Sequence, residues 1–349
     1  MKTIIKVVLI INASMFLLGG ILLGFGLLLG GKLQFGFVLN ENKFQESKYV
    51  DGEIALSNFD EMDIDLSSLE LIIEESDVSK VEYHVLEGYE PEVKVENNKL
   101  SIIQDDTKFD IKMGFYEESE YVRVYATKEQ LAKINLKSGS IKVYDIDLTG
   151  DVATTSGSII IDNSKGENLN VKANSGSMKL SNLEYNTLTT EQTSRSSNLS
   201  NVNAKTLDCK SVSGSRTLEN VVSDEISMSV TSGETKINKV EADKIKIDGG
   251  SGSIKADDCK IGDFVSDSTS GSVKIANSTL DNADIKLNSG EIKLELNGNE
   301  ADYGYDIEKG SGSIKINGAR YDDDLQKSGN TDKMLKLKST SGSINIEIN

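Results

Sequence analysis

Apolar and polar residues alternate along most of this chain, and the alternation recurs with a fixed period. The clearest copy is Ser251-Gly252-Ser253-Ile254-Lys255: a serine-flanked glycine, an apolar residue, usually a lysine, then another apolar residue. The central positions are Gly139, Gly157, Gly176, Arg195, Gly214, Gly233, Gly252, Gly271, Gly290, Gly312 and Gly342. The first step is 18 residues, the next seven are 19, and the last two are 22 and 30. A fixed short period predicts a solenoid of stacked coils.

Each coil is predicted to contain two short strands. Counted from the glycine, the second position is apolar in most coils, the fourth position is apolar, and the residue between them is polar in nearly every coil. A second apolar pair stands twelve and fourteen positions after the glycine, for example Leu169 with Val171 and Ile245 with Ile247. Alternation of this kind is typical of a strand with one buried face, and β-branched residues disfavour helix. The predicted fold class is therefore all-β, a single-stranded β-solenoid with coils of about 19 residues.

Two kinds of corner separate the strands. The glycines mark one corner, where a positive φ or a close approach of two backbones is expected. The other corner lies six positions later, at Asn163, Asn182, Asn201, Asn220, Asp258 and Asn277. Asn and Asp tolerate the left-handed backbone, so these side chains are predicted to form a polar ladder. Arg195 in a glycine position predicts a local distortion.

The first 32 residues are predicted to be an N-terminal transmembrane signal anchor, preceding the solenoid. Residues 7–31 contain no charged side chain and are long enough, as a helix, to span the membrane. Lys2 and Lys6 precede this segment, which predicts a cytoplasmic N-terminus and an extracytoplasmic solenoid in a single-pass membrane protein. A cleaved signal peptide is the alternative, although no A-x-A cleavage site follows the apolar run.

The rest of the chain divides by its patterning. Residues 33–43 are predicted to be a linker, and residues 44–136 are strand-rich without the serine–glycine period. That stretch is either an irregular first part of the solenoid that caps it or a separate small β domain. Residues 137–349 are predicted to be the regular solenoid, with a surface-loop insert at 319–333. A stack that stops on the strand at 342–348 would leave an open edge, covered by the insert or by a partner.

Little in the composition indicates catalysis. The net charge of −18 argues against a nucleic-acid partner. His84 is the only histidine, so a histidine-based triad or a histidine-rich metal site is excluded, and His84 is interpreted as an ordinary strand residue. Cys209 and Cys259 are interpreted as small core residues without a metal motif, with a disulfide between them, in an exported chain, as the alternative. We therefore predict no catalytic residues, no cofactor and no metal site.

A column of lysines is the most suggestive surface feature. Lys236, Lys255, Lys274 and Lys293 occupy the same position in four successive coils. Stacking would align their ammonium groups about 4.8 Å apart at the backbone, which is unfavourable without acidic neighbours or a bound anion. Asp257, Asp258 and Glu291 are the expected acidic neighbours. The column is either an anion-binding stripe, for an anionic envelope polymer or lipid head groups, or a solvated face that discourages association between sheets.

The chain resembles a bacterial domain family of unknown function that is built from β-strand repeats and named "putative adhesin". The resemblance rests on the Ser-Gly-Ser-Ile-Lys-Ile type phrase and on the preceding stretches 69–73, 81–85, 93–102 and 131–142. It implies a right-handed β-helix exposed on the bacterial envelope, often anchored by one N-terminal helix. The expected function is a non-enzymatic binding or scaffold role, in adhesion or envelope-stress sensing, with a protein partner as a further possibility. The alternative is a polysaccharide-active β-helix enzyme of the cell envelope.

Overall fold

The computed structural model describes Met15, Gly19 and residues 35–40, 43–46, 48–104, 111–115 and 119–349. Apart from Met15 and Gly19, the predicted membrane segment at 7–31 lies outside the described residues. Within these ranges, no helix has both the length and the apolar content needed to cross a membrane. Apart from Met15, Gly19 and the short 3-10 turn η1 (Glu300–Asp302), the regular elements described are β-strands. The all-β prediction is therefore confirmed.

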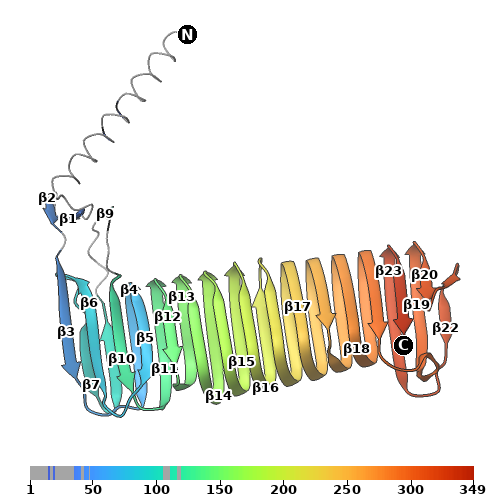
Figure 1. Ribbon diagram of the computed structural model, residues 1–349, viewed down its shortest axis with the longest axis horizontal. Coiled ribbons are helices and arrows are strands. Elements are labelled where there is room, and N and C mark those ends of the chain that lie inside the picture. The colour runs from blue at the N-terminus through green and yellow to red at the C-terminus, as the bar shows by residue number, and fades with distance from the viewer. Residues whose placement is uncertain are drawn as a thin grey trace, which may run out of the picture.

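The repeats form an elongated stack in which strands of successive coils pair in parallel (Figure 1). The register follows the sequence period, because Met178 pairs with Ser197 and Ser197 pairs with Arg216. The strands of this region are β11 (Glu129–Ser138), β12 (Ile141–Tyr144), β13 (Asp147–Ser156), β14 (Ile159–Ser175), β15 (Met178–Ser194), β16 (Ser197–Ser211), β17 (Arg216–Asp257) and β18 (Lys260–Leu296). The parallel, solenoid-like fold agrees with the prediction, while the right-handed coil sense stays a prediction.

Each coil crosses two walls that enclose the core. The first wall carries the residues just after the corner glycine, and the second wall carries the apolar pair twelve and fourteen positions on. In one coil, Ile159 and Ile161 point inward from the first wall and meet Leu169 and Val171 of the second, and all four are at most 1% exposed. Because burial alternates along both walls, the period of two in the sequence becomes an apolar interior and a polar exterior.

Both corners have the predicted backbone. The φ angles of Gly252 and Gly271 are 150° and 124°, and a Cβ on Gly271 would lie 1.7 Å from the carbonyl oxygen of Gly252. Stacking at this corner thus favours glycine, for its conformation and for its lack of a side chain. At the opposite corner, the six predicted Asn and Asp residues all have φ between 49° and 57°. Asn220 Nδ2 donates to Asn201 Oδ1, and Asn201 Nδ2 donates to Asn182 Oδ1, so the predicted polar ladder is present.

Arg195 keeps the left-handed backbone of the glycine it replaces, with φ of 84°. The parallel register continues on both sides of it, because Gln192 pairs with Ser211 and Ser197 pairs with Arg216. The expected distortion is therefore confined to the corner itself.

Replacing Arg195 with glycine is expected to raise the free energy of unfolding by about 1 kcal/mol. The substitution removes the steric cost of a Cβ at positive φ, which exceeds the backbone entropy that glycine adds to the unfolded chain. Urea unfolding of the two proteins measures the difference. Asn201→Gly is the matched control and should give no gain, because Asn tolerates this backbone and its ladder hydrogen bonds would be lost. A destabilised Arg195→Gly variant would contradict the argument.

The N-terminal strands continue both walls of the stack. β4 (Glu61–Ser68) pairs in parallel with β11 in the second wall, and β5 (Glu70–Glu75) pairs in parallel with β12 in the first wall. Outside them lie β8 (Lys99–Ile103) and β10 (Tyr121–Ala126), which pair in parallel with β4 and β5, respectively. β7 (Glu92–Glu96) pairs antiparallel with β8; β6 (Lys80–Leu86) and then β3 (Tyr49–Ala55) extend the first wall antiparallel. A separate sheet contains β1 (Phe35–Asn40), β2 (Lys43–Glu46) and β9 (Ile111–Phe115).

At the C-terminal end, the order of strands in space departs from their order in the chain. β23 (Lys333–Ser341) lies between β18 and β19 (Tyr303–Ser311), and β24 (Ile344–Ile348) lies between β18 and β20 (Ile314–Ile316). β23 and β24 thus lie between β18 and the coil that contains β19 and β20, although they follow that coil in the chain. The expectation that strand 342–348 forms the open edge is therefore wrong, because Ile344 pairs with both Ile292 and Ile314.

Antiparallel strands form the edges of both walls at both ends. At the C-terminal end, the insert contributes β21 (Ala319–Tyr321), which pairs with β20, and β22 (Leu325–Lys327), which pairs with β19. β3 and β7 hold the corresponding places at the N-terminal end (Figure 1). A parallel stack with bare ends would offer its strand edges to a second molecule, and short antiparallel edge strands oppose such growth.

Candidate functional site

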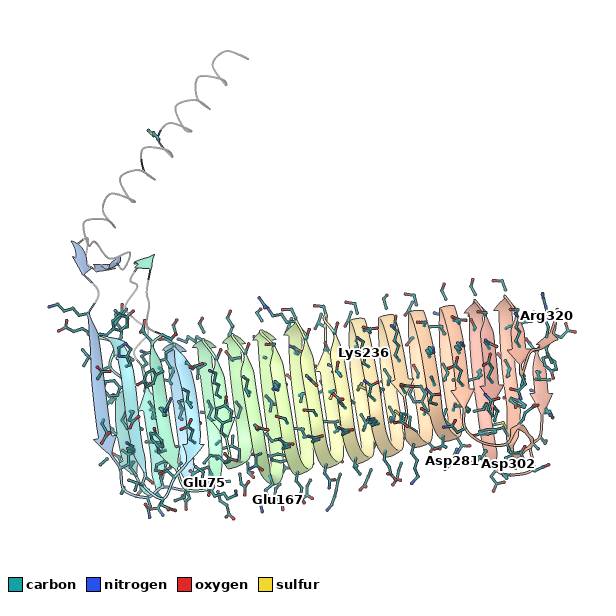
Figure 2. All side chains as sticks on the ribbon, viewed as in Figure 1. Glu75, Glu167, Lys236, Asp281, Asp302 and Arg320 are labelled. Atoms are coloured by element: carbon teal, nitrogen blue, oxygen red, sulfur yellow. The ribbon has the colours of Figure 1, made fainter. Side chains whose placement is uncertain are left out.

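The four predicted lysines form a column on the outer surface of the first wall, here called the lysine stripe (Lys236, Lys255, Lys274 and Lys293). Lys255 pairs directly with Lys274 across neighbouring coils. Figure 2 shows the position of Lys236, about midway along the stack. The side chains of Lys236 and Lys255 are 48% and 53% exposed, and that of Lys293 is 29% exposed. The alignment inferred from the period is thus present.

The lysines of the stripe have acidic neighbours other than those predicted. Glu234 Oε2 lies 3.2 Å from Lys236 Nζ, and Glu234 Oε1 lies 2.6 Å from Lys255 Nζ. Hydrogen bonds from these lysines, that of Lys255 first, lower the pKa of the Glu234 carboxyl. At the other end, Glu295 lies 2.5 Å from Lys293 Nζ and its hydrogen bond raises the pKa of that ammonium group.

The three predicted acidic neighbours form no ion pair with the stripe. Asp257 instead accepts a hydrogen bond from Asn277, and Asp258 occupies the left-handed corner. Glu291 acts on Lys293 only as a more distant charge. Position in the repeat does not explain this, because Glu291 precedes Lys293 as Glu234 precedes Lys236, and Asp257 follows Lys255 as Glu295 follows Lys293. The difference lies in the direction of each side chain, and that of Asp257 is turned to Asn277.

Lys274 is the exception within the stripe. No carboxylate of the described residues lies within 4 Å of its ammonium group, although Glu295 is close enough for Lys274 to lower its pKa. The pairs around it are partly open to solvent, and ion pairs at the surface contribute little to stability, so an anionic ligand can compete for them. Beyond Lys293 the column is interrupted, because the inserted strand β24 places Asn345 between Lys293 and Lys315.

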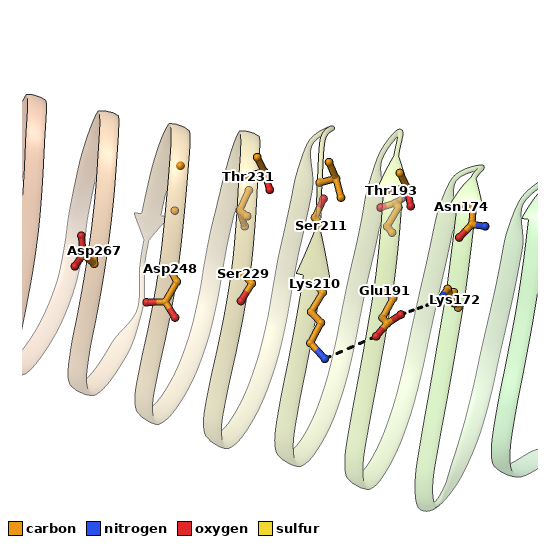
Figure 3. Close-up of a pocket in the computed structure, with 15 residues that line it drawn as sticks. Lys172, Asn174, Glu191, Thr193, Lys210, Ser211, Ser229, Thr231, Asp248 and Asp267 are labelled. Carbon is orange, nitrogen blue, oxygen red and sulfur yellow. Dashed lines mark ion pairs between the residues drawn. The ribbon is translucent and has the colours of Figure 1, made fainter.

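A groove of about 700 Å³ runs across several coils on the second wall (Figure 3). One side consists of the outward residues Lys172, Glu191, Lys210, Ser229, Asp248 and Asp267, which occupy the same position in six successive coils. Glu191 lies 3.1 Å from Lys172 and 3.7 Å from Lys210, so its carboxylate is held between two ammonium groups. The floor includes Gln192, Val230 and Gly249. Sequence analysis missed this groove, although glycines at 249 and 250 signal a loss of side-chain volume there.

A second depression of about 760 Å³ lies nearer the N-terminal end. Its lining includes Glu129, Asp147 and Glu184, together with Lys165 and Lys205. Tyr185 closes its floor, where the phenol bonds to Ser164 Oγ and to the carbonyl oxygen of Leu148, and burial raises the pKa of Tyr185 to about 12. The tyrosine is thus a neutral structural hydrogen-bonding group at physiological pH.

His84 and the cysteines have structural surroundings. His84 Nδ1 lies 2.8 Å from Asp51 Oδ1, and its ring stacks on Tyr49 with centroids 4.7 Å apart. Cys209 and Cys259 are free and buried, which confirms their interpretation as core residues, and burial raises the pKa of both thiols. In the part of the chain that the structure describes, no cluster of three or more His, Cys, Asp or Glu side chains could hold a metal ion.

Comparison with known proteins gives one family and several structures of low sequence identity. The family described as "Toastrack DUF4097" matches residues 59–215 and 196–347. A "putative adhesin" from Bacteroides fragilis is 13% identical with a TM-score of 0.38, and one from Parabacteroides distasonis is 13% identical with a TM-score of 0.42. Each comparison covers 86% of this chain and 97% of the other. A "putative lipid binding protein" from Parabacteroides distasonis is 14% identical, with a TM-score of 0.41 and coverage of 66% and 95%. No curated protein matches the chain.

Proposed function

Because the chain belongs to the DUF4097 toastrack family, we propose that it is a non-enzymatic binding or scaffold protein of the bacterial cell envelope. In this proposal, residues 7–31 anchor it in the cell membrane and the solenoid lies outside. The first wall presents equally spaced side chains on a parallel stack, which suits a ligand with repeating groups. The ligand we propose is an anionic envelope polymer or a surface of anionic lipid head groups, bound along the lysine stripe.

The observation that carries this proposal is Lys274, an exposed lysine with no carboxylate of the described residues within 4 Å, in an aligned column of solvent-accessible lysines. The net charge of −18 makes the stripe a local exception on an acidic molecule, so binding would be confined to this surface and weakened by salt. The enzyme alternative has less support. The groove on the second wall contains Glu191, but this carboxylate is paired with both Lys172 and Lys210 rather than free to act as an acid or base.

Reversing the charge of all four stripe lysines to glutamate is expected to weaken binding to isolated cell walls and anionic lipid vesicles by at least roughly tenfold at low salt. Lys274→Glu alone should account for the largest share, because the other three lysines already have carboxylate partners. The 349-residue chain in detergent is measured by co-sedimentation with walls and with vesicles separately, at two salt concentrations.

A matched control reverses four lysines of the second wall, Lys172, Lys210, Lys244 and Lys246, and changes the net charge by the same amount. Binding should persist in this variant if the stripe is the site. Unchanged binding by the stripe variant would exclude the stripe, and loss only in the control would move the site to the groove. Capture of one protein that does not respond to salt would favour a specific protein partner instead.

A further inference from the structure

An arginine lies inside the solenoid at a position that is apolar in most other coils. Arg216 occupies the second position after the corner glycine, which is Ile159, Met178 or Ile254 in other coils. The side chain points into the core and the residue is only 2% exposed. No carboxylate of the described residues lies within 4 Å of the Arg216 guanidinium. The ion pairs that these residues form all involve other cations. Arginine stays protonated in proteins, so a full positive charge is buried here.

Several polar atoms around this arginine have no hydrogen-bond partner. Arg216 Nε and Nη1 are buried and unpaired, and so is Ser197 Oγ. Ser197 pairs directly with Arg216 across the first wall, and it is 4% exposed. Gln192 Nε2 donates to the carbonyl oxygens of Gly176 at 2.7 Å and Ser196 at 3.1 Å, which places this amide beside Ser197, while Gln192 Oε1 is buried and unpaired.

The residues that the structure describes offer no ion-pair partner for Arg216. Cys209 is close enough for the positive charge of Arg216 to lower the pKa of its thiol, but burial raises that pKa more. Cys209 is therefore a neutral thiol at physiological pH. A buried charge and buried donors without acceptors are strongly unfavourable, and native proteins supply a partner for such groups.

We propose that Arg216 and Ser197 bind a small monovalent inorganic anion, with chloride as the physiological ion, inside the solenoid. The two guanidinium nitrogens and the serine hydroxyl are donors, and a spherical anion accepts from several donors at once. An accompanying water molecule would donate to Gln192 Oε1. The close-packed interior excludes a large organic anion. This site is independent of the lysine stripe, because Arg216 points inward from the first wall and the stripe lies on its outer surface.

The test compares thermal unfolding in sodium chloride and in sodium gluconate at equal ionic strength. The chain is first unfolded and refolded in each salt, so that a trapped ion is exchanged. The wild-type midpoint should be higher in chloride by about 4 °C, because the ion binds the folded state only. Arg216→Met, which copies the Met178 position, should remove this difference. Arg320→Met is the control, since it removes an exposed positive charge and should keep the difference.

Crystals of the wild type grown in bromide provide a second measurement that does not depend on folding of the variant. An anomalous peak beside the Arg216 guanidinium and Ser197 Oγ would support the site. Equal wild-type midpoints in the two salts, or no peak at Arg216, would overturn the proposal. The same outcome follows if Arg216→Met keeps the full chloride effect, because the ion would then act elsewhere.

Discussion

Replacing Gly271 with alanine is expected to lower the free energy of unfolding by about 3 kcal/mol. The added Cβ would lie 1.7 Å from the carbonyl oxygen of Gly252 in the neighbouring coil, and φ at Gly271 is 124°. A backbone oxygen cannot move aside as a side chain can, so the two coils must separate locally. Urea unfolding measures the loss, and hydrogen exchange should rise first at the corner between Gly252 and Gly290.

Gly318→Ala separates the two parts of this cost. Gly318 also has a positive φ, 81°, but nothing lies within 4 Å of the place its Cβ would take. Alanine there carries the conformational strain alone and should cost about 1 kcal/mol. If both substitutions had the same effect, close stacking of the glycine corners would not contribute to stability.

Removing residues 333–349 is expected to unfold the C-terminal end of the solenoid. These residues form the strands that separate β18 from β19 and β20, and they bury Leu335, Leu337, Ile344, Ile346 and Ile348. Burial of five such side chains contributes on the order of 10 kcal/mol before the entropy of ordering is subtracted. Residues 303–327 would then lose their inner neighbour, so limited proteolysis should cleave this segment in the truncated protein and spare it in the wild type.

The matched control is a larger deletion in phase with the repeat. Removing residues 253–271 joins Gly252 to Ser272, which restores the repeated phrase and leaves 19 fewer residues. Because coils contact only their neighbours, this variant should remain folded with a shorter stack. Resistance of residues 303–327 in the truncated protein, or collapse of the in-phase deletion, would contradict the account of the stack.

The sequence predicts the regular part of the fold closely because every coil of a solenoid has the same pattern of apolar and corner residues. Once Gly157 and Gly176 are 19 residues apart, the same spacing determines the parallel register and the inward side chains. The corner conformations also follow locally, since Asn201 and Gly271 are residue types that accept positive φ.

The strand order at the C-terminal end could not be predicted in the same way. Steps of 22 and 30 residues after Gly290 are compatible with coils stacked in chain order. The observed order depends on which strand edges β24 contacts. The segments that compete for this contact are distant in the chain and have nearly identical repeat sequences. Gly342 stacks on Gly290, and Gly312 stacks on Gly342, although all three follow a serine and stand two residues before an isoleucine.

The candidate sites were predicted unequally. The alignment of the lysine stripe follows from the period, but its pairing with Glu234 and Glu295 depends on side-chain directions. The Arg216 site was missed, although the signal was present: Ser197, Arg216 and Thr235 interrupt the apolar second position in three consecutive coils. The groove on the second wall forms where side chains of different volume from six coils lie next to one another, so the sequence of a single repeat does not reveal it.

The inserted position of β23 and β24 has a consequence for the time course of synthesis. The outermost coil, residues 303–316, leaves the ribosome before the segment 333–349 that lies beneath it. In the nascent chain, residues 303–316 therefore either stay unpaired until residues 333–349 are synthesised, or pair first with β18 and separate from it later. A chain that is cut short presents unpaired strand edges to chaperones and proteases, so the last step of assembly also distinguishes finished molecules from interrupted ones.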